Sequence, residues 1–232
     1  MTIQKNWNFD AGEVLLVDKP KTWTSFDVVN KIRYAVGKKK VGHAGTLDPL
    51  ATGLVIVCTG KMTKQIDTFQ AQKKEYTGTI YLGKTTPSFD AETEPDATFD
   101  ISSVTESQIL KVIPAFLGEI DQKPPIYSAI KKDGVRLYEH ARKGREVEIA
   151  SRKVEIFELE FTKIDLPELH FRVVCSKGTY IRSLASDIGK ALGIGAFLSE
   201  LRRTKIGDFL IEDAWDVQIL CQEIKDMKDE QA

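Results

Sequence analysis

Two long strand-like segments that follow each other directly restrict the fold of this 232-residue chain more than any other feature. They are RKVEIFELEFTKI (152–164) and ELHFRVVCS (168–176), joined by a turn that contains Pro167. Strands joined by a short turn pair antiparallel, whereas a parallel pair needs a crossover of a dozen or more residues. Elsewhere in the chain, too, strands mostly adjoin strands. The pattern predicts a mixed, mainly antiparallel sheet with flanking helices, which is an α+β fold.

Cap and turn residues divide the rest of the chain into helices and strands. Thr24 and Ser25 are candidate N-caps for one helix, and Thr105 and Gln108 have the spacing of a capping box for another. The segment LSELRRTKIGDFLIED predicts a short helix followed by a last strand. Further helices are expected at 61–70, 180–193 and from about 215, and further strands at 12–20, 53–60 and 74–83.

Composition and termini exclude several classes of protein. The sequence has no run of about 18 apolar residues, so no membrane-spanning segment is expected. The N-terminal residues resemble neither a signal peptide nor a transit sequence. Three widely spaced cysteines, Cys58, Cys175 and Cys221, lack metal-binding spacing and are typical of a reducing compartment. We therefore expect a soluble cytoplasmic protein.

Charge is segregated along the chain although the net charge is only −1. Residues 31–40 hold five basic residues and no acid, and residues 131–153 hold eight basic residues against four acidic ones. Six carboxylates and no base lie between residues 90 and 106. Such a chain can present a positive face to a polyanion, but the charges can equally be scattered over a solvated surface. Charge alone leaves both interpretations open.

The segment GHAGTLDPLATG (42–53) interrupts the regular pattern around a single carboxylate, Asp48. Asp-Pro is a common turn dipeptide, so Asp48 can be a structural turn residue. Alternatively, a carboxylate on a glycine-permitted loop beside Leu47 and Leu50 can act as a nucleophile or a base. No second acid is nearby to complete a glycosidase pair, and the glycines match neither a Walker nor a dinucleotide-binding motif. The three histidines share no metal-ligand spacing.

Two tyrosines and an arginine lie beside Lys or Gly at the expected strand ends. They are Tyr76 in KKEYTG, and Tyr180 and Arg182 in CSKGTYIRS. A strand tyrosine usually belongs to the core, and an arginine early in a helix usually lies on a solvated face or in a salt bridge. Aromatic rings beside basic residues at strand ends also suit the binding of unstacked bases.

These segments together resemble the TruB family, the bacterial tRNA pseudouridine-55 synthases. The resemblance extends over about residues 12–213 and is most specific in GTLDPLATG and CSKGTYIRSL. The other matching motifs are VDKPKTWTSFDVV, KEYTGTIYLGKTTPSFDAE, PPIYSAIKKDGVRLYEHARKG and LRRTKIGDF. The resemblance implies a pseudouridine synthase fold with a central RNA-binding cleft. Paired prolines and an Asp-Gly turn in QKPPIYSAIKKDGVRLYEHARKG (122–144) predict a hairpin-helix insertion. The resemblance implies that this insertion, from about 124 to 153, is a thumb that folds over the T-loop of tRNA.

The same resemblance assigns a role to individual residues. It implies that Asp48 is the catalytic aspartate and that Arg182 is the arginine that pairs with it. Tyr76 is expected to stack on the target uracil. The remaining expected substrate-binding residues are Tyr180 and Leu201, which line the pocket, and His43, which occupies the space left by flipped nucleotides.

Pseudouridine formation detaches a base and rejoins it, so the resemblance implies that no cofactor or metal is needed. It implies a tRNA T-arm as partner, and we expect a monomer. The family often carries a C-terminal RNA-binding domain of the PUA type. About twenty residues follow the last expected strand, so we expect a single catalytic domain over 1–232 without it. Thr22 stands where the family usually has glycine, a departure that affects turn geometry rather than chemistry.

Two other function classes are compatible with parts of the sequence. The first is a catalytically silent RNA-binding or RNA-folding module, which Asp48 opposes because a phosphate groove gains nothing from another anion. The second is an aspartate-nucleophile hydrolase of small molecules, which the missing partner acid and the segregated basic segments oppose.

Overall fold

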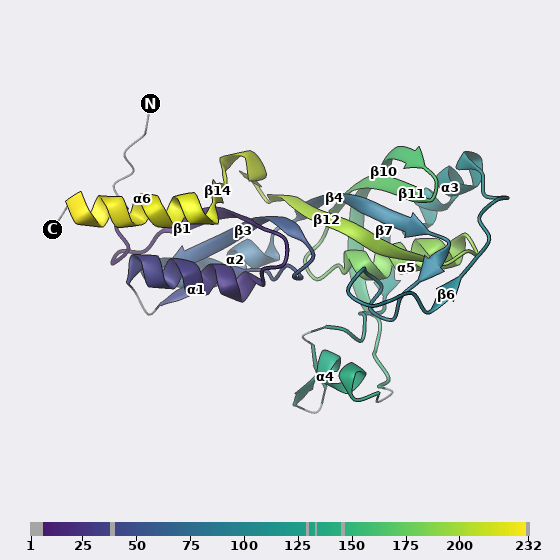
Figure 1. The fold of residues 1–232 in the computed structure, drawn as a ribbon, viewed down its shortest axis with the longest axis horizontal. Helices are drawn as coiled ribbons and strands as arrows, with labels where there is room; N and C mark the ends of the chain where they lie inside the picture. The colour runs from purple at the N-terminus through teal and green to yellow at the C-terminus, as the bar shows by residue number, and fades with distance from the viewer. Residues whose placement is uncertain (1–6, 38–39, 129, 133, 145–146, 231–232) are drawn as a thin grey trace. The chain divides into compact units, whose positions relative to one another are not determined.

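The computed structural model describes residues 7–37, 40–128, 130–132, 134–144 and 147–230 (Figure 1). The chain forms two compact units. Unit 1 consists of residues 1–75 and 202–232, and unit 2 of residues 76–201.

Unit 1 is built on a mixed sheet. β3 lies between β1 and the end of β12; it pairs antiparallel with β1 and parallel with β12. β2 also pairs antiparallel with β3, and β14 pairs parallel with β1. The core cluster of Ala44, Leu54, Ile56, Cys58 and Ile206 draws on β2, β3 and β12 and is fully buried. The strands are β1 (Val14–Lys19), β2 (Val41–Ala44), β3 (Thr52–Thr59), β13 (Phe209–Leu210) and β14 (Trp215–Asp216).

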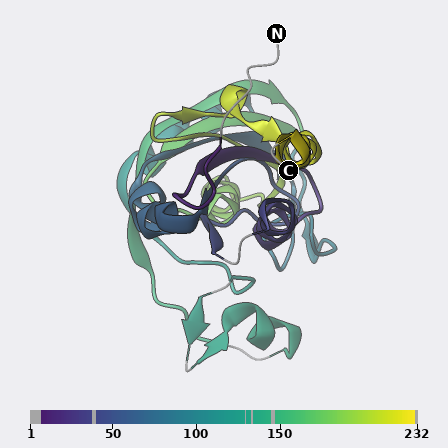
Figure 2. The same cartoon turned by 90° about the vertical axis from the view of Figure 1, so that its left-hand side faces the viewer.

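Helices α1 (Ser25–Val36) and α2 (Ile66–Ala71) lie on one side of this sheet (Figure 2). Of the two candidate caps of α1, the structure selects Thr24: its hydroxyl accepts from the Asp27 amide in a capping box. A 3₁₀ helix (Gly60–Gln65) precedes α2, and α6 (Val217–Glu230) packs against α1.

Unit 2 contains the predicted hairpin of two long strands, which is confirmed: β10 and β11 pair antiparallel. The strand order in this unit is β12-β4-β11-β10-β7, and β5–β6 and β8–β9 form two small separate ladders. The strands are β4 (Lys74–Leu82), β5 (Lys84–Thr85), β6 (Ala97–Thr98), β7 (Gly118–Gln122), β8 (Lys131–Lys132), β9 (Val135–Arg136), β10 (Arg152–Asp165), β11 (Glu168–Cys175) and β12 (Ala196–Ile206).

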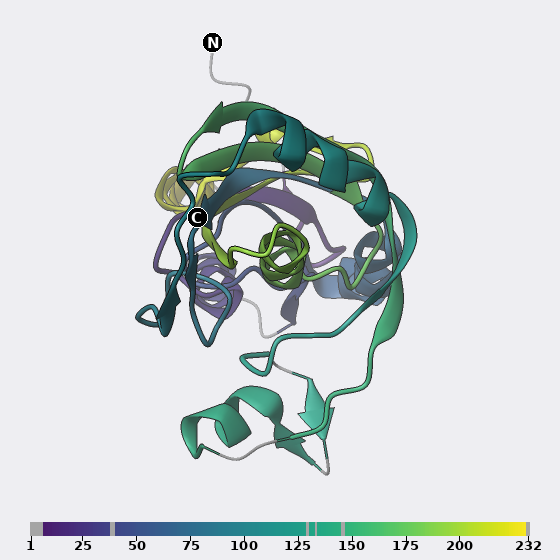
Figure 3. The same cartoon turned by 90° about the vertical axis from the view of Figure 1, so that its right-hand side faces the viewer.

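The helices of unit 2 are α3 (Glu106–Val112), α4 (Leu137–Arg142) and α5 (Ile181–Ala191). Figure 3 shows α5 end-on below the strands of unit 2 and α3 above them. The capping box expected for Thr105 and Gln108 starts α3 and is confirmed. β8, β9 and α4 form the predicted hairpin-helix insertion.

The helix predicted near the start of 198–213 is wrong, because residues 196–206 form β12. Leu, Glu, Arg and Lys in this segment favour a helix in isolation, but pairing in the sheet overrides that preference. Ser199 Oγ donates to the carbonyl of Thr79 on β4 at 3.0 Å, and Arg202 and Arg203 pair with Thr52 and Gly53 of β3. Propensity is a local quantity, whereas these contacts join distant segments.

Within the described ranges, no helix is both long and apolar enough to cross a membrane.

Candidate active site

Asp48 lies on the loop that connects β2 to β3. The β2–β3 ladder ends at the pair Ala44–Ile56, and residues 45–51 connect the two strands. These residues together with Thr52 and Gly53, the first two residues of β3, are here called the Asp48 loop. The Ala51 amide donates to the Asp48 carbonyl at 3.1 Å and closes a tight turn with Pro49 at its second position. The half-buried Asp48 side chain is therefore attached to a defined turn.

Main-chain groups on both sides of Asp48 are hydrogen-bonded to other segments of unit 1. Ser25 Oγ accepts from the Leu47 amide at 2.9 Å and donates to the Leu47 carbonyl at 3.3 Å. The Pro49 carbonyl accepts from the Thr22 amide at 2.8 Å and from Lys19 Nζ at 3.4 Å. Ser25, one of the two candidate caps, thus holds the Asp48 loop instead of capping the helix.

Lys19 places a cation beneath the loop. Its side chain is fully buried, and Nζ also donates to the carbonyls of Pro20 at 2.9 Å and Trp23 at 2.6 Å. Burial lowers the pKa of Lys19 to about 8, an effect that the negative charge of Asp48 opposes. At neutral pH, Lys19 therefore supplies positive charge close to Asp48.

The lowered pKa of Lys19 predicts a dependence of stability on pH. Between about pH 8 and 10.5 the unfolded chain binds more protons at Lys19 than the folded chain, so folding becomes more favourable as pH rises. Compared with Lys19→Met, the wild type should gain about 1–3 kcal/mol of unfolding free energy over this window. Chemical denaturation of both proteins from pH 7 to 10 measures the difference, and a constant difference would contradict the prediction.

Thr22 explains how this chain accommodates the missing glycine. Its φ is 73°, in the left-handed region that a β-branched residue seldom adopts. In this conformation its amide donates a hydrogen bond to the Pro49 carbonyl. The turn therefore keeps a glycine-type geometry with a threonine in it.

We expect Thr22→Gly to raise the free energy of unfolding by about 1 kcal/mol, because glycine relieves backbone strain at an exposed position. Thr22→Ala is the matched control: it also removes the hydroxyl and the branch but keeps Cβ, so it should recover less than half of the gain. Equal gains in thermal or chemical denaturation would show that backbone strain is not the cause.

His43 lies on β2, two residues before the Asp48 loop, and is half-buried. Burial lowers its pKa, and the nearby positive charge of Arg203 acts in the same direction, whereas a hydrogen bond with the Gly45 backbone opposes them. The imidazole is therefore neutral at pH 7. A neutral, half-buried ring can pack against a base without adding charge.

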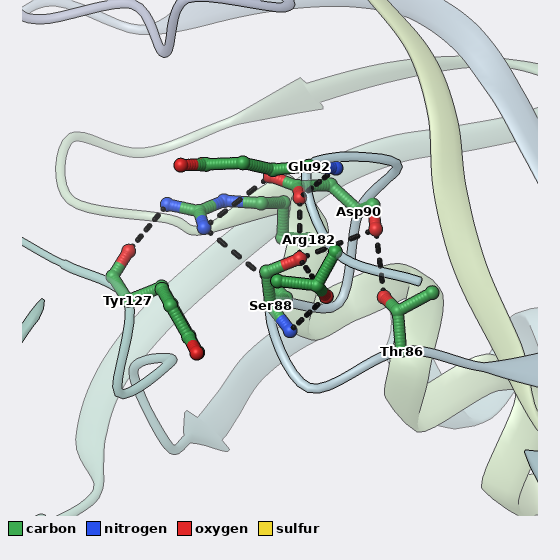
Figure 4. Close-up of polar contacts among 7 residues, drawn as sticks. Thr86, Ser88, Asp90, Glu92, Tyr127 and Arg182 are labelled. Atoms are coloured by element: carbon green, nitrogen blue, oxygen red, sulfur yellow. Dashed lines mark hydrogen bonds and ion pairs between the residues drawn. The ribbon is translucent and has the colours of Figure 1, made fainter. Parts of the chain in front are cut away.

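Arg182 occupies the second position of α5 and is only 4% exposed. Its Nη1 lies 3.4 Å from Oδ2 of the buried Asp90 and donates to the Ser88 carbonyl at 3.3 Å. Its Nη2 donates to the Tyr127 carbonyl at 3.0 Å (Figure 4). Arg182 is thus not on a solvated face: it joins α5, the segment after β5 and the start of the insertion.

Asp90, the buried partner of Arg182, is not singled out by the sequence, where it is one of six carboxylates between residues 90 and 106. The Asp90 carboxylate accepts from Ser88 Oγ at 2.6 Å and from the Glu92 amide at 2.9 Å, and its carbonyl accepts from Thr86 Oγ1 at 2.7 Å (Figure 4). Short hydroxyl residues around an aspartate are a turn signal that could have separated Asp90 from its acidic neighbours. Asp90 orients the Arg182 guanidinium.

Tyr180 is the N-cap residue of α5 and is held from two directions. The buried Gln122 side chain accepts from the Tyr180 amide at 2.8 Å and donates to its carbonyl at 3.1 Å. The Arg152 guanidinium lies 4.7 Å from the centre of the Tyr180 ring, and Arg152 Nη2 donates to the Gly178 carbonyl. The Tyr180 main chain is therefore held in place, and its ring has a cation beside it.

The six candidate residues divide between the units. Asp48 and His43 belong to the β2–β3 hairpin of unit 1, and Tyr76, Tyr180, Arg182 and Leu201 belong to unit 2. Tyr76 on β4 is 8% exposed, and Leu201 on β12 is half-buried. Among the residues with described positions, no group of three His, Cys, Asp or Glu side chains could hold a metal ion.

Family models match residues 33–232 of this chain. Residues 33–181 match the model of the TruB family pseudouridylate synthase N-terminal domain, and residues 182–232 match that of the tRNA pseudouridylate synthase B C-terminal domain. The tRNA pseudouridine synthase B of Flavobacterium johnsoniae is 60% identical over 90% of this chain and 94% of its own length. That of Parabacteroides distasonis is 56% identical over 88% of this chain and 90% of its own.

Solved structures give the same fold. The structure of a Cbf5-Nop10-Gar1 complex superimposes with a TM-score of 0.75 at 32% identity over 97% of this chain. An H/ACA RNP bound to a substrate RNA containing 2′-deoxyuridine superimposes with a TM-score of 0.72 at 29% identity, also over 97%. This chain spans 57% and 56% of the length of those two chains. The expected fold class is confirmed.

Proposed function

Because this chain belongs to the TruB family of pseudouridylate synthases, we propose that it converts uridine 55 in the T-loop of tRNA to pseudouridine, with Asp48 as the catalytic carboxylate. The observation that carries the assignment of Asp48 is its loop, in which the neighbouring residues Leu47 and Pro49 are hydrogen-bonded to β1, α1 and the turn between them. A catalytic group held in this way needs little reorganisation to react.

The reaction breaks the bond between N1 of uracil and C1′ of the ribose and forms a bond between C5 and C1′. The proton on C5 is lost and N1 gains one, so the reaction is an isomerisation that requires no redox partner. Asp48 can add to the sugar, add to the base or remove a sugar proton, and all three roles need its anionic form. The Lys19 cation beneath the loop supports that form.

The other five candidate residues surround the flipped uridine in this proposal. Arg182 pairs with Asp48, and Tyr76 stacks on the detached uracil, an interaction worth about 1–3 kcal/mol for a base on an aromatic ring. Tyr180 and Leu201 line the pocket and exclude water. His43 fills the space that flipped nucleotides leave, a role that suits its neutral ring.

The proposed partner is the T-arm of tRNA, and a cytoplasmic monomer is the proposed working form. We treat residues 1–232 as one catalytic domain, because β4 and β12 each contain residues of both units. The insertion 124–153 serves as the thumb. Single-stranded loops with splayed bases are the usual targets of sequence-specific RNA recognition.

Incubation of the purified protein with a T-arm transcript that carries tritium on C5 of its uridines tests the proposal. Isomerisation of one uridine releases the tritium of that uridine to solvent, and mapping of the product shows which position has reacted. Release of one equivalent with modification at uridine 55 is expected. Binding of the transcript without release of tritium would identify the RNA-binding alternative. If the protein neither binds the transcript nor releases tritium, the proposal is wrong.

The thumb should hold the RNA through phosphates. Alanine at Arg142, Lys143 and Arg145 should weaken binding of different tRNAs equally and make the log–log salt dependence shallower, by roughly 0.7–0.9 per lost contact. Lys143 is exposed directly after α4, whereas Arg145 and the side chain of Arg142 lie outside the described residues. An unchanged slope in binding titrations at several salt concentrations would show that these residues are solvated surface.

A further inference from the structure

Arg203 on β12 is one of the largest fully buried side chains of the protein, with 1% of its surface exposed. Its Nε donates to the Leu54 carbonyl at 2.7 Å, and its Nη2 donates to the Gly45 carbonyl at 3.1 Å. Gly45 is the first residue of the Asp48 loop, and Leu54 directly follows its last residue. One planar guanidinium therefore connects the two ends of the segment that bears Asp48.

Arg203 connects the two strands of the β2–β3 hairpin beyond their last ladder pair. The two strands separate after the pair Ala44–Ile56, so Gly45 and Leu54 do not bond to each other in the ladder. Nε and Nη2 form one edge of the guanidinium and donate to both carbonyls at once. The side chain thus links the two segments at the place where their ladder ends.

The glycines at the two ends of the loop both lie beside Arg203. A Cβ on Gly45, with φ of 88°, would make an ordinary contact with Arg203 Nη1 at 3.5 Å. Gly53, with φ of 105°, would place a Cβ 2.3 Å from the Arg203 carbonyl oxygen, so no larger residue fits. The side chain of Arg203 meets one end of the loop, and its backbone meets the other.

Burial of this cation needs a physical reason. Within the part of the chain that the structure describes, both hydrogen-bond acceptors of Arg203 are main-chain carbonyls, and no carboxylate forms an ion pair with it. A buried charge without a counter-ion is costly. Its neighbour Arg202 shows the ordinary alternative: it is partly exposed and forms two hydrogen bonds with Asp18.

We propose that Arg203 is a positioning residue for the reaction: it fixes the ends of the Asp48 loop and so sets where the Asp48 carboxylate stands relative to the uridine. This inference rests on the proposed function. A displacement of about 1 Å at a reacting group can cost on the order of a hundredfold in rate. Loss of Arg203 should therefore lower kcat far more than RNA affinity.

Single-turnover tritium release and tRNA binding, measured for the wild type, Arg203→Met, Arg203→Lys and Ile206→Ala, test the proposal. Arg203→Met should lose about a hundredfold in rate, while Kd for tRNA stays within about threefold. Arg203→Lys should fall between it and the wild type, because an ammonium keeps the charge but cannot donate to both carbonyls in one plane. Ile206→Ala removes a buried side chain of the same strand and is the control for lost stability.

Rates are compared at a temperature well below the melting temperature of every variant. Ile206→Ala should be destabilised by about 2–5 kcal/mol yet keep a rate within threefold of the wild type. If Arg203→Met does not fold, Arg203→Lys decides: a tenfold or greater loss of rate at unchanged Kd supports the proposal. A rate within threefold for a folded Arg203 variant, or equal losses in Ile206→Ala, would overturn it. Inactivity of the wild type itself would instead refute the proposed function.

Discussion

Asp48→Asn is expected to reduce the rate of isomerisation by at least about a thousandfold while tRNA binding survives. The substitution keeps the size of the side chain and removes only its charge and basicity. The turn should persist, because Asp48 contributes its main-chain carbonyl to it and the flanking residues are held by Ser25, Thr22 and Lys19. Single-turnover tritium release and filter binding measure the two quantities separately.

Asp67→Asn is a suitable control, because it removes an exposed carboxylate from α2 in the same unit. Its rate and affinity should match those of the wild type. If Asp48→Asn retained a rate within tenfold of the wild type, Asp48 would be neither nucleophile nor base. The carboxylate would then be the structural turn residue that its Asp-Pro sequence also allows.

Arg182→Met should lower both activity and stability. The substitution takes the cation from the buried Asp90 and the donors from the carbonyls of Ser88 and Tyr127. Leaving one partner of a buried ion pair uncompensated costs about 3–5 kcal/mol, so this variant should be clearly less stable than the wild type. No motif in the sequence indicates this cost, because Ser88, Asp90 and Tyr127 lie far from Arg182 in the chain.

Activity of Arg182→Met, measured where the variant is folded, separates the two roles of the arginine. If Arg182 also pairs with Asp48, the acidic limb of the pH–rate profile should move to higher pH. Arg182→Lys keeps the charge but loses the planar fork, and should be intermediate in both stability and pH profile. An unmoved acidic limb together with lost stability would mean that Arg182 serves Asp90 alone.

Local signals in the sequence predicted those parts of the fold whose cause is local. The N-cap at Thr24 or Ser25, the capping box of Thr105 and Gln108, the turn at Pro167 and the 152–176 hairpin each depend on residues a few positions apart. All are present, with Thr24 as the cap. The short helix predicted at the start of 198–213 has the same origin, because the residues there favour a helix locally. The partners of this segment in the sheet, β3 and β4, are far away in the chain, and their pairing makes it a strand.

The sequence by itself also determined the family and indicated Asp48. Both depend on short motifs whose residues are neighbours in the chain, among them a lone carboxylate in a glycine-bounded loop. Only the tertiary structure decided what holds that loop and its partners. The carbonyls that accept from Arg182 and Arg203 lie 94 and 149 residues from them in the chain, at Ser88 and Leu54. Every residue has a main-chain carbonyl, so no sequence motif indicates which carbonyls accept these bonds. The sequence also does not distinguish a buried arginine from an exposed one, because burial depends on the folded chain.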